Sequence, residues 1–157
     1  MNQYRIEKLD RHDRSRFDCG STELDQYLRE RASQDMRRRV TSCFVAVDDK
    51  GEVAGFYTLA AASLPVDQLS AEREKRLPRY PVLPAVLLGR LAVSMAHQGK
   101  RLGAALIADA LIRATQSEVM VYAMIVDAKD DQATRFYTNL AFEPSRDNPR
   151  RLFRTLR

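Results

Sequence analysis

Residues 87–105 read LLGRLAVSMAHQGKRLGAA, and this stretch decides the fold. Apart from Arg90, its first seven residues carry no charged or polar side chain, which is typical of a strand buried inside a sheet. A glycine-containing loop follows at 98–103 and leads into a predicted helix over 102–115. Backbone N–H groups at the start of a helix, together with the helix dipole, can hold a phosphate. The stretch therefore predicts a strand, an anion-binding loop and a helix, in that order.

The rest of the chain predicts further strands and helices on both sides of this stretch. Strands are expected where apolar residues alternate or run together, namely over 4–9, 40–47, 53–63, 119–127, 141–144 and 150–156. Ser21 is a good N-cap for a helix over 21–35, and a second helix is expected over 132–140. This order predicts an α/β fold with a mixed sheet, in a single domain that covers residues 1–157.

The segment 64–84 contains four prolines and several charges, so we expect it to lie outside the core. Part of it, residues 70–76, is predicted to form a short helix. Segments of this kind usually cover a site or contact a partner, although a simple insertion is an alternative.

The composition narrows the possible functions. Of 26 basic residues 21 are Arg, and the net charge is +5, which fits a phosphate-rich partner and equally fits a surface of solvated arginines. His12 and His97 are the only histidines, so we expect no metal site built on histidine and no Ser-His-Asp triad. Cys19 and Cys43 lack metal-ligand spacing, so we expect two reduced thiols near or in the core. No apolar run could cross a membrane and residues 1–17 lack a signal-peptide centre, so a cytoplasmic protein without membrane contact is expected.

The order of strand, Gln98-Gly99-Lys100-Arg101-Leu102-Gly103 loop, helix, strand, and helix with the pair Phe136-Tyr137 resembles the GNAT family of acetyl-CoA-dependent N-acetyltransferases. Within that family, several phrases are similar to the GNAT toxins of type II toxin–antitoxin modules. These phrases lie at 17–20, 55–59, 88–93, 131–137 and 142–145. The resemblance covers 4–156 and implies the single-domain GNAT acyl-CoA N-acyltransferase fold.

The resemblance implies acetyl-CoA as cofactor and Tyr137 as the catalytic acid that protonates the departing thiolate, while Phe136 is expected to be the core aromatic residue. The cofactor-binding residues it implies are Leu91, Ala92, Val93, Gln98, Gly99, Lys100, Arg101, Leu102, Gly103, Ala104 and Asp130. Arg101 stands where the family usually has glycine. We expect its side chain to alter the path of the loop and the affinity for acetyl-CoA.

No strong general base is evident, which favours an acceptor amine of low pKa, such as an α-amino group near a pKa of about 8. The resembling toxins acetylate the α-amino group of aminoacyl-tRNA, which blocks translation, and they form homodimers neutralised by a ribbon-helix-helix antitoxin. The residues expected to contact tRNA phosphates are Arg37, Arg38, Arg39, Arg90, Arg150, Arg151 and Arg154. Two alternatives remain: a GNAT enzyme acting on a small amine or a protein N-terminus, and a non-catalytic acyl-CoA-binding or RNA-binding module.

Overall fold

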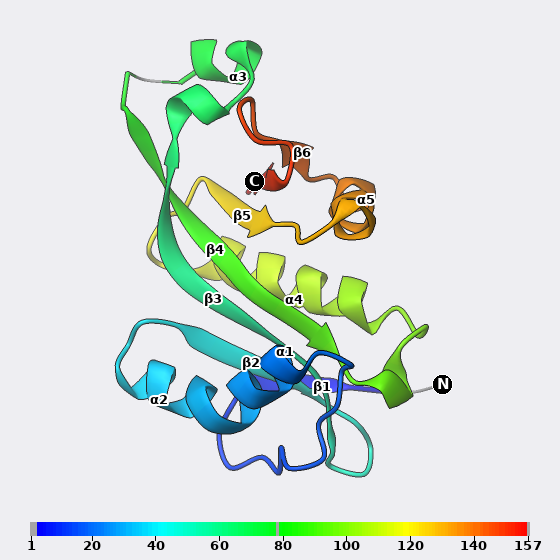
Figure 1. The fold of residues 1–157 in the computed structure, drawn as a ribbon. Helices are drawn as coiled ribbons and strands as arrows, with labels where there is room; N and C mark the ends of the chain where they lie inside the picture. Colours follow the sequence, from blue (N-terminus) through cyan, green and yellow to red (C-terminus); the bar gives the residue numbers. More distant parts are fainter. Residues whose placement is uncertain (1–2, 78, 157) are drawn as a thin grey trace. The chain divides into compact units, whose positions relative to one another are not determined.

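Figure 1 follows the chain through the strands and helices of the computed structural model, which describes residues 3–77 and 79–156. The chain divides into two compact units, Met1–Ala60 with Leu88–Ala110 and Ala61–Leu87 with Leu111–Arg157. The expectation of a single domain stays a prediction. No described helix combines the length and the apolar character needed to cross a membrane.

The first unit contains a sheet in the order β1-β2-β3-β4. Its strands are β1 (Arg5–Lys8), β2 (Ser42–Val47) and parts of β3 (Val53–Pro65) and β4 (Val82–Val93). The first three strands are antiparallel, and β1 is the edge strand, with Arg5 opposite Val47 and Lys8 opposite Phe44. The strands expected over 4–9, 40–47 and 53–63 are confirmed.

A long helical segment follows β1, as Ser21 predicted: the Ser21 hydroxyl accepts a hydrogen bond from the Leu24 N–H at 3.3 Å. The segment consists of α1 (Thr22–Gln26), a π-helical turn η1 (Tyr27–Arg31) and α2 (Ala32–Arg37). The π turn was not expected. It contains two adjacent residues, Tyr27 and Leu28, that are both fully buried.

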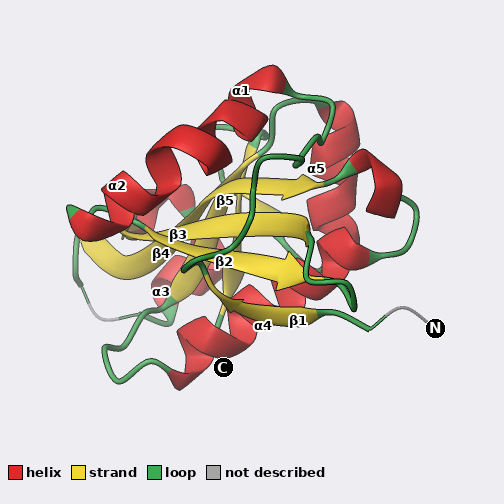
Figure 2. Cartoon of the chain, turned by 90° about the horizontal axis from the view of Figure 1, so that it is seen from below, coloured by secondary structure: helices red, strands yellow, loops and turns green. Residues whose placement is uncertain are grey.

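In the first unit, α1 and α2 cover one face of the β1–β3 sheet (Figure 2). The part of α4 (Leu102–Gln116) that belongs to this unit, up to Ala110, lies on the other face. Neighbouring residues on β3 point to opposite faces. Phe56 packs on the α1 side, where its ring stacks on Tyr27 with centroids 6.4 Å apart. Gly55 faces α4 at very close range: a Cβ there would lie 3.0 Å from the carbonyl oxygen of Ala92 and 3.1 Å from Leu106 Cδ1.

The second unit contains the strand order β3-β4-β5-β7-β6, with β5 (Ala123–Asp127), β6 (Glu143–Pro144) and β7 (Arg151–Thr155). Strand β4 is parallel to β5, with Ala85 opposite Ala123, whereas β7 is antiparallel to both β5 and β6. The sheet is therefore mixed, as expected.

Helix α5 (Asp131–Asn139) and the short helices η2 (Val66–Gln68) and α3 (Ala71–Lys75) also belong to the second unit. Helices α3 and α5 confirm the helices expected over 70–76 and 132–140. The strand expected over 119–127 begins later, because Val119 and Met120 are 75% and 78% exposed and precede it. The irregular segment expected over 64–84 is shorter, since β3 continues to Pro65 and β4 starts at Val82.

Both cysteines are free thiols near or in the core, as expected. Cys43 is fully buried, and this burial raises the pKa of its thiol to about 12. Cys19 is half-buried, and burial together with the neighbouring Asp25 raises its pKa to about 11. Both thiols are therefore protonated at neutral pH.

The close packing at Gly55 generates a stability prediction. Gly55→Ala places a methyl group against the Ala92 carbonyl and the first turns of α4, which we expect to lower the free energy of unfolding by about 1–3 kcal/mol. Urea unfolding measures this difference. Gly89→Ala is the matched control, because its Cβ would meet only Thr58 Oγ1, at 3.4 Å, and should cost nothing measurable. Equal stability of the two variants would contradict the packing argument.

Candidate active site

Residues 98–101 join a short helix, η3 (Met95–His97), to α4, so the predicted loop at 98–103 includes the first two residues of the helix. Gly99 and Arg101 have φ angles of 81° and 62°, so two residues of this short loop are in the left-handed region. Helix α4 then begins at Leu102, and the N–H of Ala105 bonds to the Arg101 carbonyl at 3.2 Å. The N–H groups of the first turn have no carbonyl partner within the helix. This end of α4 therefore has the chemistry of an anion site.

Arg101 adopts the backbone conformation that favours glycine. The expected effects on the loop path and on the affinity for acetyl-CoA stay predictions, and the backbone conformation carries an energetic cost. For a residue with a Cβ that cost is about 1–2 kcal/mol. In return, the exposed guanidinium adds a positive charge beside the helix start, next to the exposed Lys100.

Gln98 uses its side chain to anchor the loop. Its Nε2 donates hydrogen bonds to the carbonyl oxygens of Val93 at 3.0 Å and Cys19 at 3.3 Å. Val93 ends β4, and Cys19 lies just before α1, so one amide ties three segments of the first unit together. Gln98 was expected to bind the cofactor, and this stays a prediction. In the structure its side chain holds the loop that is expected to bind the cofactor.

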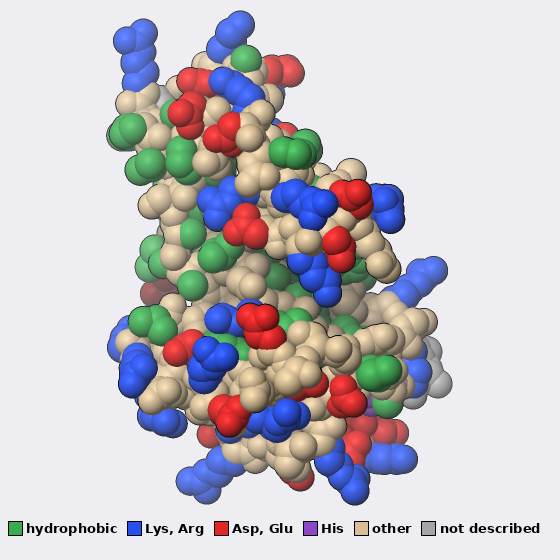
Figure 3. All heavy atoms as spheres, viewed as in Figure 1, with side chains coloured by type: hydrophobic (Ala, Val, Ile, Leu, Met, Phe, Trp, Pro, Cys, Tyr) green, Lys and Arg blue, Asp and Glu red, His purple; other side chains and the backbone are tan. Residues whose placement is uncertain are grey.

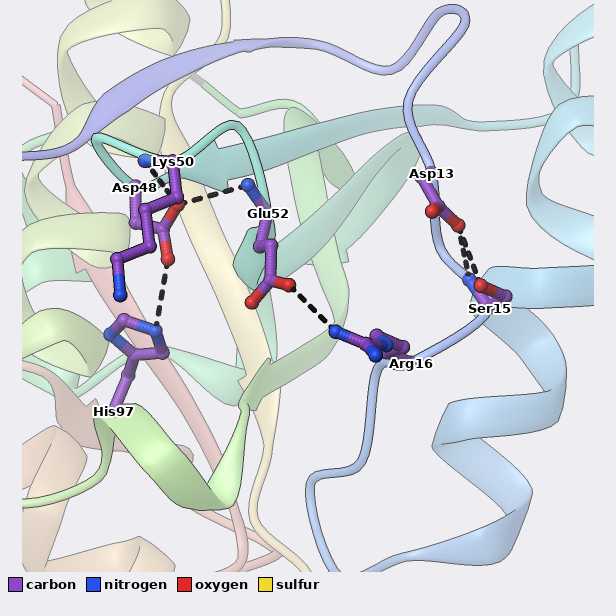
Figure 4. Close-up of polar contacts among 7 residues, drawn as sticks. All are labelled: Asp13, Ser15, Arg16, Asp48, Lys50, Glu52 and His97. Atoms are coloured by element: carbon purple, nitrogen blue, oxygen red, sulfur yellow. Dashed lines mark hydrogen bonds and ion pairs between the residues drawn. The ribbon is translucent and has the colours of Figure 1, made fainter.

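His97, immediately before the loop, forms a polar centre that the sequence did not indicate (Figure 4). Its Nε2 lies 3.4 Å from Asp48 Oδ2, and its Nδ1 lies 2.8 Å from the Tyr4 hydroxyl. Because Nε2 faces a carboxylate, we assign the ring proton to Nε2 and the acceptor role to Nδ1. Burial raises the pKa of Asp48, but hydrogen bonds from the N–H groups of Glu52 and Lys50 outweigh it and hold the pKa low. His97 thus attaches the start of the loop to the β2–β3 turn.

Leu91–Val93 lie at the end of β4 in the first unit. Ala92 is buried in the core beside Phe56, while Leu91 and Val93 are half-buried. The N–H of Ser94, the next residue, donates to the Ala54 carbonyl at 2.8 Å, which pins the end of β4 to β3.

Tyr137 belongs to α5 in the second unit and is only 8% exposed. Its ring makes edge contacts with Phe136 and Phe142, at centroid distances of 5.1 and 5.5 Å. Burial raises the pKa of its phenol to about 12, because it disfavours the phenolate. The group is therefore a proton donor rather than a base. Phe136 was expected to be the more buried aromatic residue, and this was wrong, since Phe136 is only half-buried.

Asp130 is the N-cap of α5. Its Oδ1 accepts a hydrogen bond from the Ala133 N–H at 2.8 Å. The residue expected to bind cofactor thus also fixes the start of the helix that carries Tyr137.

The arginines expected to bind tRNA fall into two groups. Arg37, Arg38 and Arg39 are exposed at the end of α2, and no described acidic residue forms an ion pair with them. The other four each have a protein partner. Arg90 lies 3.6 Å above the centroid of the Tyr27 ring, Arg150 donates to Asp131 at 3.0 Å, Arg151 binds Asp127 through two bonds, and Arg154 donates to the Leu140 carbonyl.

Acidic side chains accompany many of the basic ones on the surface. On the face drawn in Figure 3, Lys and Arg lie among Asp and Glu rather than in one continuous basic patch. Arginine count alone therefore overstates the positive surface available to a polyanion.

The left-handed Arg101 generates a second prediction. Arg101→Gly relieves the backbone strain, whereas Arg101→Ala removes the same charge and keeps a Cβ in the left-handed region. We expect the glycine variant to be more stable than the alanine variant by about 1 kcal/mol. Thermal and urea unfolding of the two proteins measure the difference. An alanine variant as stable as the glycine variant would show that residue 101 is not strained.

Comparison with known proteins places these features in a family. The model of the acetyltransferase (GNAT) family matches residues 6–142. A protein of Mycobacterium tuberculosis named tRNA-acetylating toxin is 37% identical over 142 residues, which cover 89% of this chain and 84% of the relative.

Solved structures of other proteins are also similar to this chain. The structure of AtaT complexed with acetyl-methionyl-tRNAfMet has a TM-score of 0.91 and 28% identity, and covers 98% of this chain and 95% of AtaT. A mutant AtaT bound to the C-terminus of the antitoxin AtaR and acetyl-CoA has a TM-score of 0.81 and 26% identity, with 98% and 93% covered. With the mixed sheet and the loop before α4, these matches show that the chain belongs to the GNAT family of acetyltransferases.

Proposed function

We propose that this protein is the toxin of a type II toxin–antitoxin module and transfers an acetyl group from acetyl-CoA to the α-amino group of aminoacyl-tRNA. The observation that carries the proposal is the 37% identity, over 89% of the chain, to a toxin named for acetylating tRNA. The likeness of the whole fold to AtaT in complex with its acetylated tRNA supports the same substrate class.

The loop at 98–103 and the start of α4 bind the cofactor. Two left-handed residues lead the chain into a helix whose first N–H groups suit a pyrophosphate, and Lys100 and Arg101 add positive charge. The end of β4 borders the pantetheine arm. The proposed cofactor-binding residues are Leu91, Ala92, Val93, Gln98, Gly99, Lys100, Arg101, Leu102, Gly103, Ala104 and Asp130.

Acetyl-CoA supplies the activated acetyl group. As the α-amino nitrogen forms its bond to the thioester carbonyl carbon and the C–S bond breaks, Tyr137 would donate its phenolic proton to the departing sulfur. It would regain a proton from the nitrogen, which loses one when the amide forms, and its raised pKa keeps the phenol protonated at neutral pH. The acceptor needs little help, because an α-amino group has a pKa of about 8 and is partly neutral near pH 7. The proposed mechanism therefore needs one acid and no strong base.

Arginine side chains bind the tRNA through its phosphates. Arg37, Arg38 and Arg39 are exposed and contribute most directly. Arg90, Arg150, Arg151 and Arg154 also contact tRNA in this proposal. A guanidinium has five N–H donors, so the protein contacts of these four leave further donors for phosphate.

The proposal extends to assembly and location. The protein forms a homodimer, and a ribbon-helix-helix antitoxin neutralises it. It acts in the cytoplasm in this proposal, because aminoacyl-tRNA is used there.

The acid role of Tyr137 generates a third prediction. Tyr137→Phe removes the proton donor and leaves the ring contacts, so we expect kcat to fall by about 100-fold or more with the melting temperature maintained. Steady-state kinetics with charged tRNA measure it. Tyr122→Phe is the matched control, since it deletes a hydroxyl from a half-buried tyrosine of the same unit. A Tyr137→Phe enzyme with normal kcat would place the acid elsewhere.

The substrate is tested by incubating the protein with labelled acetyl-CoA and total charged tRNA, and in parallel with the same tRNA after deacylation. We expect label only in the charged sample, and release of that label as an acetylated amino acid when the ester is hydrolysed. Equal labelling of both samples, or of neither, contradicts the proposal. Parallel incubations with small amines and with peptides identify an enzyme of the alternative kind.

A further inference from the structure

The segment between β3 and β4, in the second unit, forms a groove of about 710 Å³. Val66 and Leu77 line it and pack against the core of that unit. Three other lining residues, Lys75, Arg79 and Tyr80, are exposed, and the Tyr80 side chain is 61% exposed. An exposed aromatic ring beside two cations above an apolar floor is a combination that a folded core does not require.

The walls of this groove are held by contacts within the second unit. The Val66 N–H donates to the Pro81 carbonyl at 3.0 Å, which joins the two ends of the segment. Arg73 of α3 forms an ion pair with Glu143, with its Nε 3.1 Å from Oε1. These contacts hold helix α3 and the Val66–Pro81 end of the groove in place.

The charge of the groove is positive. Glu74 is its acidic lining residue, and its carboxylate is paired with Arg146 at 3.2 Å. Among the residues that the structure describes, no acidic side chain forms an ion pair with Lys75 or Arg79. The two cations are therefore available to an anionic ligand.

A ligand that matches these groups has a flat aromatic face and neighbouring negative charges, as a nucleotide does. Aromatic side chains bind bases by stacking, and lysine and arginine bind the phosphates of the same strand. Bases inside a duplex already stack on each other, so such a site takes unpaired nucleotides. The groove volume lies within the usual range of small-ligand sites.

We propose that this groove binds an unpaired nucleotide near the aminoacylated 3′ end of the tRNA, with its base stacked on Tyr80 and phosphates next to Lys75 and Arg79. The inference rests on the proposed function, because an enzyme that acetylates the amino acid must hold that end of the tRNA. The adenine nucleotide of coenzyme A shares the same chemistry, and the experiment separates the two sources.

The experiment compares three variants with the wild type in steady-state acetylation of charged tRNA. Tyr80→Ala should raise KM for aminoacyl-tRNA roughly tenfold, with a smaller effect on kcat and an unchanged KM for acetyl-CoA. Tyr80→Phe keeps the stacking face and should restore the KM. Val82→Ala removes a neighbouring exposed apolar side chain outside the groove and serves as the control. Melting temperatures establish that each variant is folded.

A binding measurement locates the contact on the RNA. Deacylated tRNA is compared with the same tRNA lacking its unpaired 3′ nucleotides, by fluorescence anisotropy. Trimming should lower the affinity of the wild type for the tRNA. It should lower the affinity of Tyr80→Ala only slightly, because the substitution and the trimming remove the same contact. The triple variant Arg37→Ala, Arg38→Ala, Arg39→Ala should weaken binding of both RNAs alike, as expected for contacts to the paired region.

Three results would overturn the proposal: a Tyr80→Ala enzyme with wild-type KM for tRNA, a raised KM for acetyl-CoA instead, or an equal loss on trimming in wild type and Tyr80→Ala. A Tyr80→Ala protein that binds RNA normally but escapes neutralisation by its antitoxin would make the groove a protein-docking site. If the wild type fails to acetylate charged tRNA, the proposed function fails, and the anisotropy measurement alone decides whether the groove binds RNA.

Discussion

The absence of a side chain at Gly55 sets where the N-terminal end of α4 can lie. Leu102, the first residue of α4, and Leu106 pack directly over this glycine, and the Ala92 carbonyl approaches from the end of β4. Helix and strand ends meet at this point because no Cβ separates them. The loop before Leu102 is then fixed from the other side by the Gln98 amide. A packing constraint in the core therefore determines the geometry of a surface loop.

Much of the fold could be predicted because its signals are local. Alternation and capping located β1, β2, β3 and the helix that starts after Ser21, since a residue's neighbours along the chain decide these features. The burial of individual residues in short segments was harder to predict from the sequence. Phe136 and Tyr137 are adjacent in a nine-residue helix, and tertiary contacts such as that of Tyr137 with Phe142 decide which ring is inside. Val119 is apolar but precedes its strand, because residue type does not establish burial.

The candidate site was predictable to the extent that it depends on a contiguous motif. The loop and the unusual residue at position 101 are visible in the sequence, but the left-handed backbone that accommodates Arg101 is not. The His97 centre joins Tyr4 and Asp48, which lie far away in the chain, so no spacing rule indicates it. Likewise, an arginine cluster in the sequence does not show that Arg151 is already bound to an aspartate while Arg38 is not.

The protonated state of the two cysteines has a practical consequence for chemical probes. Thiol reagents attack the thiolate, and a thiol with a pKa of about 11 is ionised in roughly one molecule in ten thousand at pH 7. Cys43 is lower still in reactivity, since it is also fully buried. We therefore expect both native thiols to react slowly with maleimides at pH 7. A single cysteine introduced on an exposed surface would carry a fluorophore with little background, without first removing either native thiol.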